Sequence, residues 1–141
     1  MIDPAEQLFQ GEFEITEWEA QPYSEPGSHS ELSRVRVGKA FSGDFSGSST
    51  AELLMAGNNH GAGYVASELF TGAVGGREGS MVLQHWGVAE GAEAASSGHI
   101  IPGSGTGELT GICGKVVYSQ DSDGQHRVEL RVFFQLPPVS V

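Results

Sequence analysis

Glu68 is an ionisable residue at a position where the sequence pattern predicts burial. In the segment YVASELF, Glu68 shares one face of an extended chain with Tyr64, Ala66 and Phe70, because side chains of a strand alternate between its two faces. A carboxylate inside an apolar interior tends to have a raised pKa and can act as an acid or a base. The alternatives are that Glu68 pairs with an arginine across the fold or that it faces solvent.

A histidine occupies a similar position in the segment MVLQHWG. His85 shares its face with Met81 and Leu83, which makes it the best placed of the five histidines for proton transfer near neutral pH. A lone histidine on an apolar face is more often a hydrogen-bonded core residue. We therefore predict Glu68 and His85 as the catalytic pair, with a purely structural His85 as the alternative.

The predicted ligand-binding residues lie on strand faces that can point inward, or near the ends of those strands. Trp18 and Tyr64 can wall a ligand, although large aromatic residues usually fill core. Glu52 is either interior or exposed, and His126 stands near one mouth because it begins the inward face of the last strand. The full predicted set is Trp18, Glu52, Tyr64, Phe70, Met81, Leu83, His126, Leu130 and Phe134.

Other chemistries lack their sequence patterns. The histidines share no local spacing and the chain has one cysteine, so we predict no metal site and no cofactor. The glycine-rich segment IIPGSGTGELTGICG fits neither phosphate-binding motif: Glu108 stands where the dinucleotide motif needs glycine, and Val116 stands where a P-loop needs Ser or Thr. We interpret this segment as a bent corner between strands, with one helical turn in GTGELTG.

Composition and charge limit the partners. A chain of 141 residues fits one domain, which we place at 1–141 with terminal tails at 1–10 and 137–141. The net charge of −11 repels nucleic acid and anionic lipid, so we predict neither nucleic acid nor membrane as a partner. The N-terminal segment MIDPAEQLFQ does not look like a signal peptide and the single Cys113 gives no internal disulfide, so we expect a cytoplasmic protein.

The elements that must position these side chains are strands. The last one is the clearest, because apolar and polar residues alternate from His126 onward with Phe133 as the one exception on the polar side. The small-residue stretch 89–98 is predicted as a loop. Eight strands joined mostly by short turns predict an all-β, eight-stranded antiparallel up-and-down barrel, wide enough to hold one small ligand. The predicted strands cover 11–21, 32–41, 45–56, 64–74, 80–88, 99–103, 115–118 and 126–136.

Three runs of the sequence carry a family likeness: FSGDFSGSSTAELLMA, YVASELFTGAVGGREGSMVLQHWG and IIPGSGTGELTGICG. Together they resemble an uncharacterised bacterial family placed with the allene-oxide-cyclase-like barrels, distant fold kin of allene oxide cyclases and dirigent proteins. The likeness covers Trp18 to about Phe134. It implies an eight-stranded antiparallel barrel with an internal cavity and no settled activity. The sequence departs from the pattern at Met81, where an aromatic residue is expected, and at Cys113, where arginine is expected.

These observations lead to a functional prediction. We expect the barrel to bind a small, largely apolar molecule and to promote its isomerisation or cyclisation, by holding one folded conformer and by acid–base assistance from Glu68 and His85. The alternative is a non-catalytic carrier or sensor of a lipid-like molecule, and a third interpretation is a solid barrel that serves as an assembly module. Closed barrels often associate, so a homo-oligomer is plausible, although the sequence shows no obvious interface.

Overall fold

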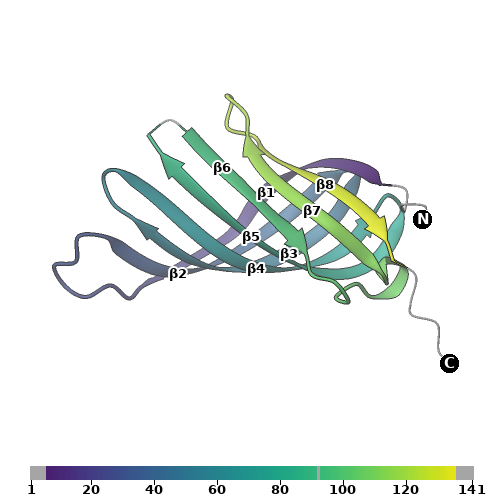
Figure 1. Cartoon of the computed structure of the whole chain (residues 1–141), viewed down its shortest axis with the longest axis horizontal. Helices are drawn as coiled ribbons and strands as arrows, with labels where there is room; N and C mark the ends of the chain where they lie inside the picture. The colour runs from purple at the N-terminus through teal and green to yellow at the C-terminus, as the bar shows by residue number, and fades with distance from the viewer. Residues whose placement is uncertain (1–5, 92, 136–141) are drawn as a thin grey trace.

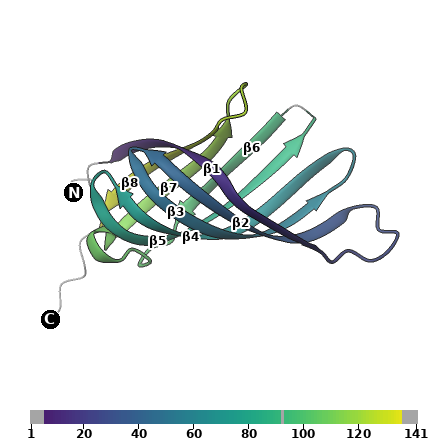
Figure 2. The same ribbon diagram turned by 180° about the vertical axis from the view of Figure 1, so that it is seen from behind.

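The chain folds into one closed barrel of eight antiparallel strands. The computed structural model describes residues 6–91 and 93–135, and in it each strand pairs with the next while β8 pairs back onto β1 (Figures 1 and 2). This confirms the predicted all-β antiparallel barrel. The elements are β1 Gln7–Pro22, β2 Glu31–Gly43, β3 Phe45–Gly57, β4 Gly61–Val74, β5 Arg77–Glu90, β6 Glu93–Ile100, the 3-10 turn η1 Gly107–Leu109, β7 Ile112–Gln120 and β8 His126–Phe134.

The barrel has two unlike ends. We call the end that holds the turn at Asp44, the turn at 75–76 and the connection 101–111 the closed end, and the opposite end, with the loops 23–30 and 58–60, the open end (Figure 1). Backbone hydrogen bonds tie the closed end together: the amide of Asp44 donates to the carbonyl of Gln10, and the amide of Gly75 donates to the carbonyl of Asp44.

Aromatic and aliphatic side chains fill the barrel toward its closed end. Phe41 lies near the centre of this packing, with its ring centroid 5.4 to 5.6 Å from those of Phe13, Phe45 and Phe70. The fully buried Leu109 of η1 packs into the same cluster from the connection between β6 and β7. A smaller cluster of Val35, Val37, Ala51, Leu53 and Ala66 lies toward the open end.

The glycine-rich segment forms the predicted bent corner. It connects β6 to β7 and runs along β5, where the amide of Thr106 donates to the carbonyl of Ser80 (2.9 Å) and the hydroxyl of Ser104 accepts from the amide of Val82 (3.0 Å). Gly107 has φ +58°, a left-handed conformation that glycine adopts without strain. The predicted helical turn is η1, and the described part of the chain has no helix with the length and hydropathy needed to cross a membrane.

The first and last strands differ from their predicted bounds. The predicted tail 1–10 is wrong at its end, because β1 begins at Gln7 and residues 7–10 pair with residues 129–132 of β8. The last strand ends at Phe134 instead of 136, while Leu136 and the predicted tail 137–141 lie outside the described residues.

The predicted loop at 89–98 is also wrong. Most of this stretch belongs to β6, whose residues pair with β5 from Ala94 opposite Ala89 to Ile100 opposite Leu83. Small residues hid the strand because Ala, Ser and Gly give no contrast between an apolar and a polar face. Hydrogen bonds with the neighbouring strand β5 hold this segment in an extended conformation. The local sequence pattern does not reveal these bonds.

Candidate functional site

Glu68 is the centre of a buried polar cluster in the middle of the barrel. It lies on β4 with 1% of its surface exposed, and its carboxylate accepts hydrogen bonds from four side chains. Oε1 accepts from His85 Nε2 (2.8 Å) and the Tyr118 hydroxyl (2.7 Å). It also accepts from Lys39 Nζ (3.1 Å), while Oε2 accepts from the Ser49 hydroxyl (2.5 Å). We call these five residues the buried cluster.

Five different strands bring the buried cluster together. Lys39 on β2 and Ser49 on β3 are direct cross-strand partners, and Glu68 follows on the next strand, β4. His85 on β5 pairs with Ala66, one inward position from Glu68, and Tyr118 reaches the cluster from β7 across the barrel. Because inward side chains of a closed barrel point at a shared axis, residues from distant strands meet there.

The buried cluster holds Glu68 as a carboxylate. Burial by itself would raise the pKa of Glu68, but the hydrogen bond from His85, the charge of Lys39 and the hydrogen bond from Ser49 together outweigh burial and bring that pKa to about 2. Burial lowers the pKa of Lys39, and its ion pair with Glu68 opposes this effect. The Lys39 ammonium also lies 4.7 Å from the ring centroid of Phe13 and 4.5 Å from that of Tyr118, which stabilises it as a cation.

A chain of hydrogen bonds leads from Glu68 toward the open end. The Tyr64 hydroxyl lies 2.9 Å from His85 Nδ1 and 3.0 Å from the Ser96 hydroxyl, and both Tyr64 and Ser96 are partly exposed. We call Ser96, Tyr64, His85 and Glu68 the relay. An ionised Glu68 can only accept, so His85 Nε2 carries a hydrogen. His85 Nδ1 then accepts from Tyr64 in the neutral imidazole and donates to Tyr64 in the imidazolium.

Both tyrosines of this region are proton donors at neutral pH. Burial raises the pKa of the Tyr64 hydroxyl, with the charge of Glu68 acting in the same direction and the hydrogen bond with Ser96 opposing it. Burial raises the pKa of Tyr118 well above its usual value, and Glu68 adds to the effect because a phenolate beside a carboxylate is repelled. Both tyrosine residues are partly exposed, but the Tyr118 hydroxyl is the more deeply buried of the two and donates to Glu68.

Trp18 lies at the open end on the inner side of the sheet. A bulge between Ile15 and Glu17 adds one residue to β1, after which Trp18 pairs with the buried Val37. The opposite strand contains Gly38 here, where a Cβ would lie 2.9 Å from the Thr16 hydroxyl. Trp18 is 52% exposed, because β1 pairs with β8 only as far as Phe13. Its predicted role as a ligand wall stays a prediction.

Four of the predicted lining residues belong to the packed interior, and their ligand-binding role stays a prediction. They pack against one another and against the phenylalanines of the closed end, so the predicted internal cavity is not confirmed. Phe134 is partly buried beside them, with the Arg77 guanidinium 4.1 Å from its ring centroid. His126 stacks on Phe13 with ring centroids 4.9 Å apart, at the start of β8 as predicted. The four core residues are Phe70, Met81, Leu83 and Leu130.

Of the two alternatives for Glu52, the structure has the exposed one, so Glu52 does not line the interior of the barrel. It shares an outward face with Leu54, and its carboxylate pairs with Arg34 (3.4 Å) and Arg36 (3.2 Å) on the outside of β2. The alternation of β3 places Ser49 inward and Glu52 outward. Among the described residues, no group of three or more His, Cys, Asp or Glu is arranged to hold a metal ion.

Sequence reasoning missed four residues of the cluster and the relay. Lys39 carried a signal, because it stands between Val37 and Phe41 on the apolar face of its strand. Tyr118 shares a face with Val116 in the same way. Ser49 and Ser96 gave no signal of their own, since small polar residues occur on both faces of strands. The alternative that Glu68 pairs with an arginine was right in expecting a basic partner, but the partner is Lys39.

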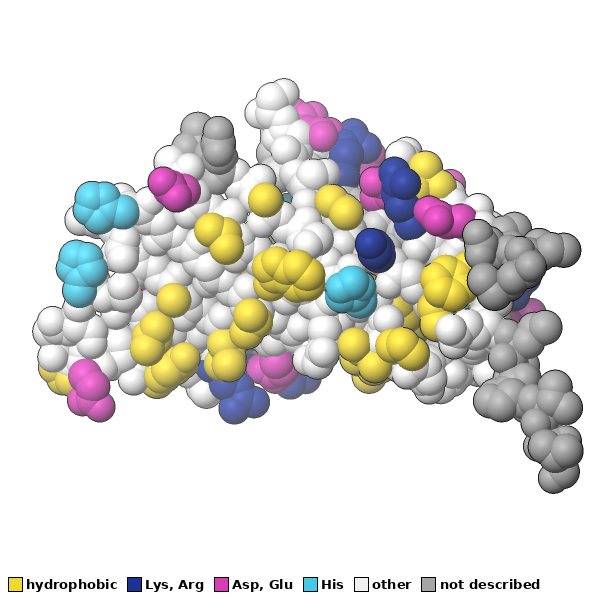
Figure 3. Space-filling view, viewed as in Figure 1, with side chains coloured by type: hydrophobic (Ala, Val, Ile, Leu, Met, Phe, Trp, Pro, Cys, Tyr) yellow, Lys and Arg dark blue, Asp and Glu magenta, His cyan; other side chains and the backbone are white. Residues whose placement is uncertain are grey.

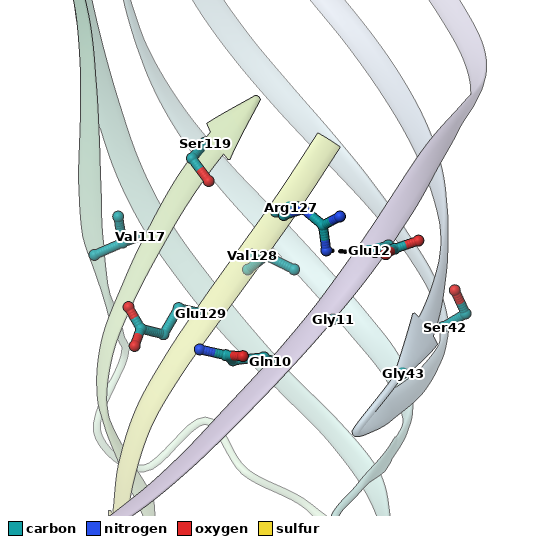
Figure 4. Close-up of a pocket in the computed structure, with 10 residues that line it drawn as sticks. All are labelled: Gln10, Gly11, Glu12, Ser42, Gly43, Val117, Ser119, Arg127, Val128 and Glu129. Carbon is teal, nitrogen blue, oxygen red and sulfur yellow. Dashed lines mark hydrogen bonds and ion pairs between the residues drawn. The ribbon is translucent and has the colours of Figure 1, made fainter. Parts of the chain in front are cut away.

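A separate hollow of about 430 Å³ lies on the outer wall, where β7, β8, β1 and β2 run side by side (Figure 4). Its floor contains the cross-strand pair Gly11 and Gly43. Arg127 stands in the hollow and is held by Glu12 (2.9 Å) and Asp121 (2.5 Å). This hollow is separate from the buried cluster, because its polar side chains face outward.

The comparisons with known proteins agree with this barrel. A family model described as a protein of unknown function (DUF3224) matches residues 9–132. The crystal structure of a protein with unknown function from the DUF3224 family of Shewanella oneidensis is similar to this chain, with 31% sequence identity and a TM-score of 0.81. That likeness covers 94% of this chain and 100% of the other. No curated protein matches.

Proposed function

This chain belongs to the DUF3224 family, and we propose that it binds a small, largely apolar molecule at the open end of its barrel and promotes its isomerisation or cyclisation. The observation that carries the proposal is the relay. The partly exposed Tyr64 hydroxyl is connected through His85 to the buried carboxylate of Glu68. Proton transfer requires such a connected series of hydrogen-bond donors and acceptors. The aliphatic cluster that includes Val35 and Leu53 packs against Tyr64, and the half-exposed Trp18 offers apolar surface on the inner side of the open end.

Each member of the relay has a distinct part in the proposed reaction. Tyr64 is the catalytic residue, because its hydroxyl is the ionisable group of the relay that a molecule at the open end can touch. His85 exchanges the proton with Tyr64. Glu68 is a positioning residue: its buried carboxylate fixes the His85 tautomer and stabilises the imidazolium. This revises the predicted pair, since Glu68 itself is enclosed by its four donors.

The proton path is balanced within the site. A substrate oxygen, such as a carbonyl or an epoxide oxygen, replaces the Ser96 hydroxyl as the partner of Tyr64. Tyr64 donates its proton to that oxygen while the His85 imidazolium returns a proton to Tyr64 from Nδ1. After the carbon skeleton has rearranged, the proton returns along the same path. The composition of the substrate is unchanged, as an isomerisation requires.

The proposal includes the kinship with allene-oxide-cyclase-like barrels. Eight antiparallel strands around inward polar side chains are compatible with that kinship, which directs the choice of substrates toward oxygen-bearing polyenes. The cytoplasmic location predicted from the sequence is part of the same proposal, and cell fractionation tests it.

A carrier or sensor is the second candidate. In the described residues, every buried side-chain nitrogen and oxygen atom has a hydrogen-bond partner, so the buried cluster is complete without a ligand. A complete polar cluster suits a rigid binding barrel as well as a catalyst. The two candidates differ in whether a bound molecule leaves the protein chemically unchanged.

The test uses purified protein with a panel of polyene epoxides and conjugated enones as probes. Binding is followed by perturbation of amide NMR signals, and conversion by chiral chromatography with mass detection. We expect Tyr64→Phe and His85→Gln to lower the rate of conversion by about a hundredfold or more, the usual contribution of a general acid. Tyr23→Phe and His99→Gln are matched controls, because Tyr23 and His99 are exposed outside the relay.

Three outcomes distinguish the candidates. Conversion that depends on Tyr64 and His85 supports the proposal. Conversion at the wild-type rate in both variants shows that the relay is not the site. Binding at the open end without conversion of any probe supports the carrier in place of the enzyme.

A further inference from the structure

One wall of the barrel carries exposed apolar side chains and no charge at its centre. In the described residues, the outward positions of β4 from Val65 to Ala73 and of β5 from Ser80 to Val88 carry no charged side chain. We call this surface, with Leu54 of β3 and with Ala95 and Ser97 of β6, the uncharged wall. Figure 3 shows hydrophobic side chains running across the middle of this side of the molecule, with charged side chains mostly toward its margins.

The apolar side chains of the uncharged wall form a continuous row. Leu54, Val65 and Trp86 are direct cross-strand neighbours on β3, β4 and β5. Together with Leu69 and Val88 they lie between 44% and 62% exposed. Scattered exposed apolar residues are ordinary, but a contiguous apolar row across three strands is a mark of an interaction surface.

The rest of the protein makes the absence of charge informative. The chain has a net charge of −11, and the opposite wall carries ion-paired side chains such as Arg36 with Glu17 and Arg127 with Glu12. Two copies of such a chain repel each other unless they meet through a surface without charge. A partner of opposite charge would be attracted to the acidic surface elsewhere.

We propose that the uncharged wall is the interface of a symmetric homodimer of this chain. A two-fold axis along β4 places Leu54 of one copy against Trp86 of the other and Val65 against its own counterpart, so the row is complementary to itself. The two sheets then pack face to face, as sheets do in β-sandwiches.

The size of the uncharged wall fits a small, reversible dimer interface. The uncharged outward positions of β4 run from Val65 to Ala73, over about 30 Å, and three to four strands span about 15 Å. The resulting area is on the order of 450 Å² for each copy, below the roughly 800 Å² that each partner of a standard stable interface buries, so self-association should depend on protein concentration. Glu52 with its arginine partners forms one margin of this area, and Lys115 on β7 forms the other.

The experiment compares two identical changes at different walls. Val65→Glu puts a charge at the centre of the row, and Val117→Glu puts the same charge on β7 at a position that is also exposed. Sedimentation velocity over a wide range of protein concentrations should show a wild-type dimer that high salt does not weaken. We expect Val65→Glu to weaken self-association by about tenfold or more, because the charge would be buried without a partner. Val117→Glu should leave self-association unchanged.

A cross-linking measurement keeps the proposal falsifiable if Val65→Glu folds poorly. Ser67→Cys stands on β4 beside the proposed axis and should form a disulfide-linked dimer under mild oxidation, whereas Ser119→Cys on β7 should not. A wild-type protein that sediments as a monomer at every concentration overturns the proposal. A dimer that Val65→Glu leaves intact, or one that Ser119→Cys links as readily as Ser67→Cys, overturns the choice of wall.

Discussion

The two ends of the barrel differ in what fills them. At the closed end, phenylalanine rings and Leu109 pack into one apolar cluster that backbone turns hold from outside. At the open end, the inner face of β1 carries the half-exposed Ile15 and Trp18, and the relay reaches the surface through Ser96. The closed end therefore supplies most of the hydrophobic stabilisation, and the open end is the part that a ligand can reach.

The buried cluster lies between the two ends and connects them. Lys39 contacts the rings of Phe13 and Tyr118, which belong to or pack against the closed-end cluster, while His85 contacts Tyr64 of the open end. A charged group in this place needs a rigid, fully hydrogen-bonded surrounding, because an unpaired buried charge is costly. The barrel therefore has three parts along its axis: apolar packing at the closed end, a buried ion pair in the middle and a partly exposed relay at the open end.

The largest expected effect compares truncation of one aromatic residue at each end. Phe70→Ala at the closed end should lower the free energy of unfolding by about 3–5 kcal/mol, since Phe70 is fully buried among other rings. Trp18→Ala at the open end should change it by less than about 1 kcal/mol, because Trp18 is half exposed. Urea denaturation measures both. Equal losses would show that stability is not concentrated at the closed end.

The second prediction concerns the ion pair of the buried cluster. Glu68→Leu leaves the Lys39 ammonium buried without its carboxylate, which should lower the free energy of unfolding by about 3 kcal/mol or more. The double variant Glu68→Leu with Lys39→Met removes both charges and should recover most of this loss. A double variant as unstable as the single one would mean that Glu68 stabilises the barrel mainly through His85, Tyr118 and Ser49.

Much of the fold and part of the site were predictable from the sequence. The period of two along β4 and β5 predicted that Glu68 and His85 point inward, and both are buried. The same period applied to β2 would have placed Lys39 inward beside them. Local alternation suffices for these residues because a strand in a closed sheet has one face inside and one outside.

The contacts within the site were not predictable in the same way. Tyr118 is 50 residues from Glu68 in the chain, and its contact follows from closure of the barrel rather than from any local pattern. The bulge after Ile15 also escaped prediction: simple alternation from Phe13 would put Trp18 on the opposite face, although the two residues share the inner side. Gly38 was the one local signal, because only a residue without a Cβ leaves space for the bulge.

The third prediction follows from the pKa of Glu68. Folding lowers this pKa from 4.5 to about 2, so the unfolded chain binds the proton more readily than the folded one. The associated stability is present above pH 4.5 and is lost as the pH falls toward 2, by about 3 kcal/mol in all.

Urea denaturation between pH 6 and pH 2 tests this dependence. The control is Glu68→Gln, which cannot titrate and should lose this component of the pH dependence while it keeps the contribution of exposed carboxylates. A wild-type profile that matches that of Glu68→Gln would contradict an ionised Glu68. This prediction is specific to the buried cluster and independent of both ends of the barrel.

The smallest expected change in stability belongs to the relay at the open end. Tyr64→Phe removes one partly exposed hydroxyl and should lower the free energy of unfolding by about 1 kcal/mol, because water can reach the groups it leaves behind. Tyr118→Phe removes a hydroxyl that Glu68 uses inside the barrel and should cost about 2 kcal/mol, since hydrogen bonds to charged groups are stronger.

Urea denaturation of both variants, with NMR of the histidine ring nitrogens, separates stability from the hydrogen bonding of the relay. Tyr64→Phe should change the Nδ1 signal of His85, because Nδ1 loses its hydrogen-bond partner, while the buried ion pair of Lys39 and Glu68 stays intact. If Tyr64→Phe destabilises the protein as strongly as Tyr118→Phe, the Tyr64 hydroxyl is part of the structural core. The open end would then lack the exposed donor that distinguishes it from the closed end.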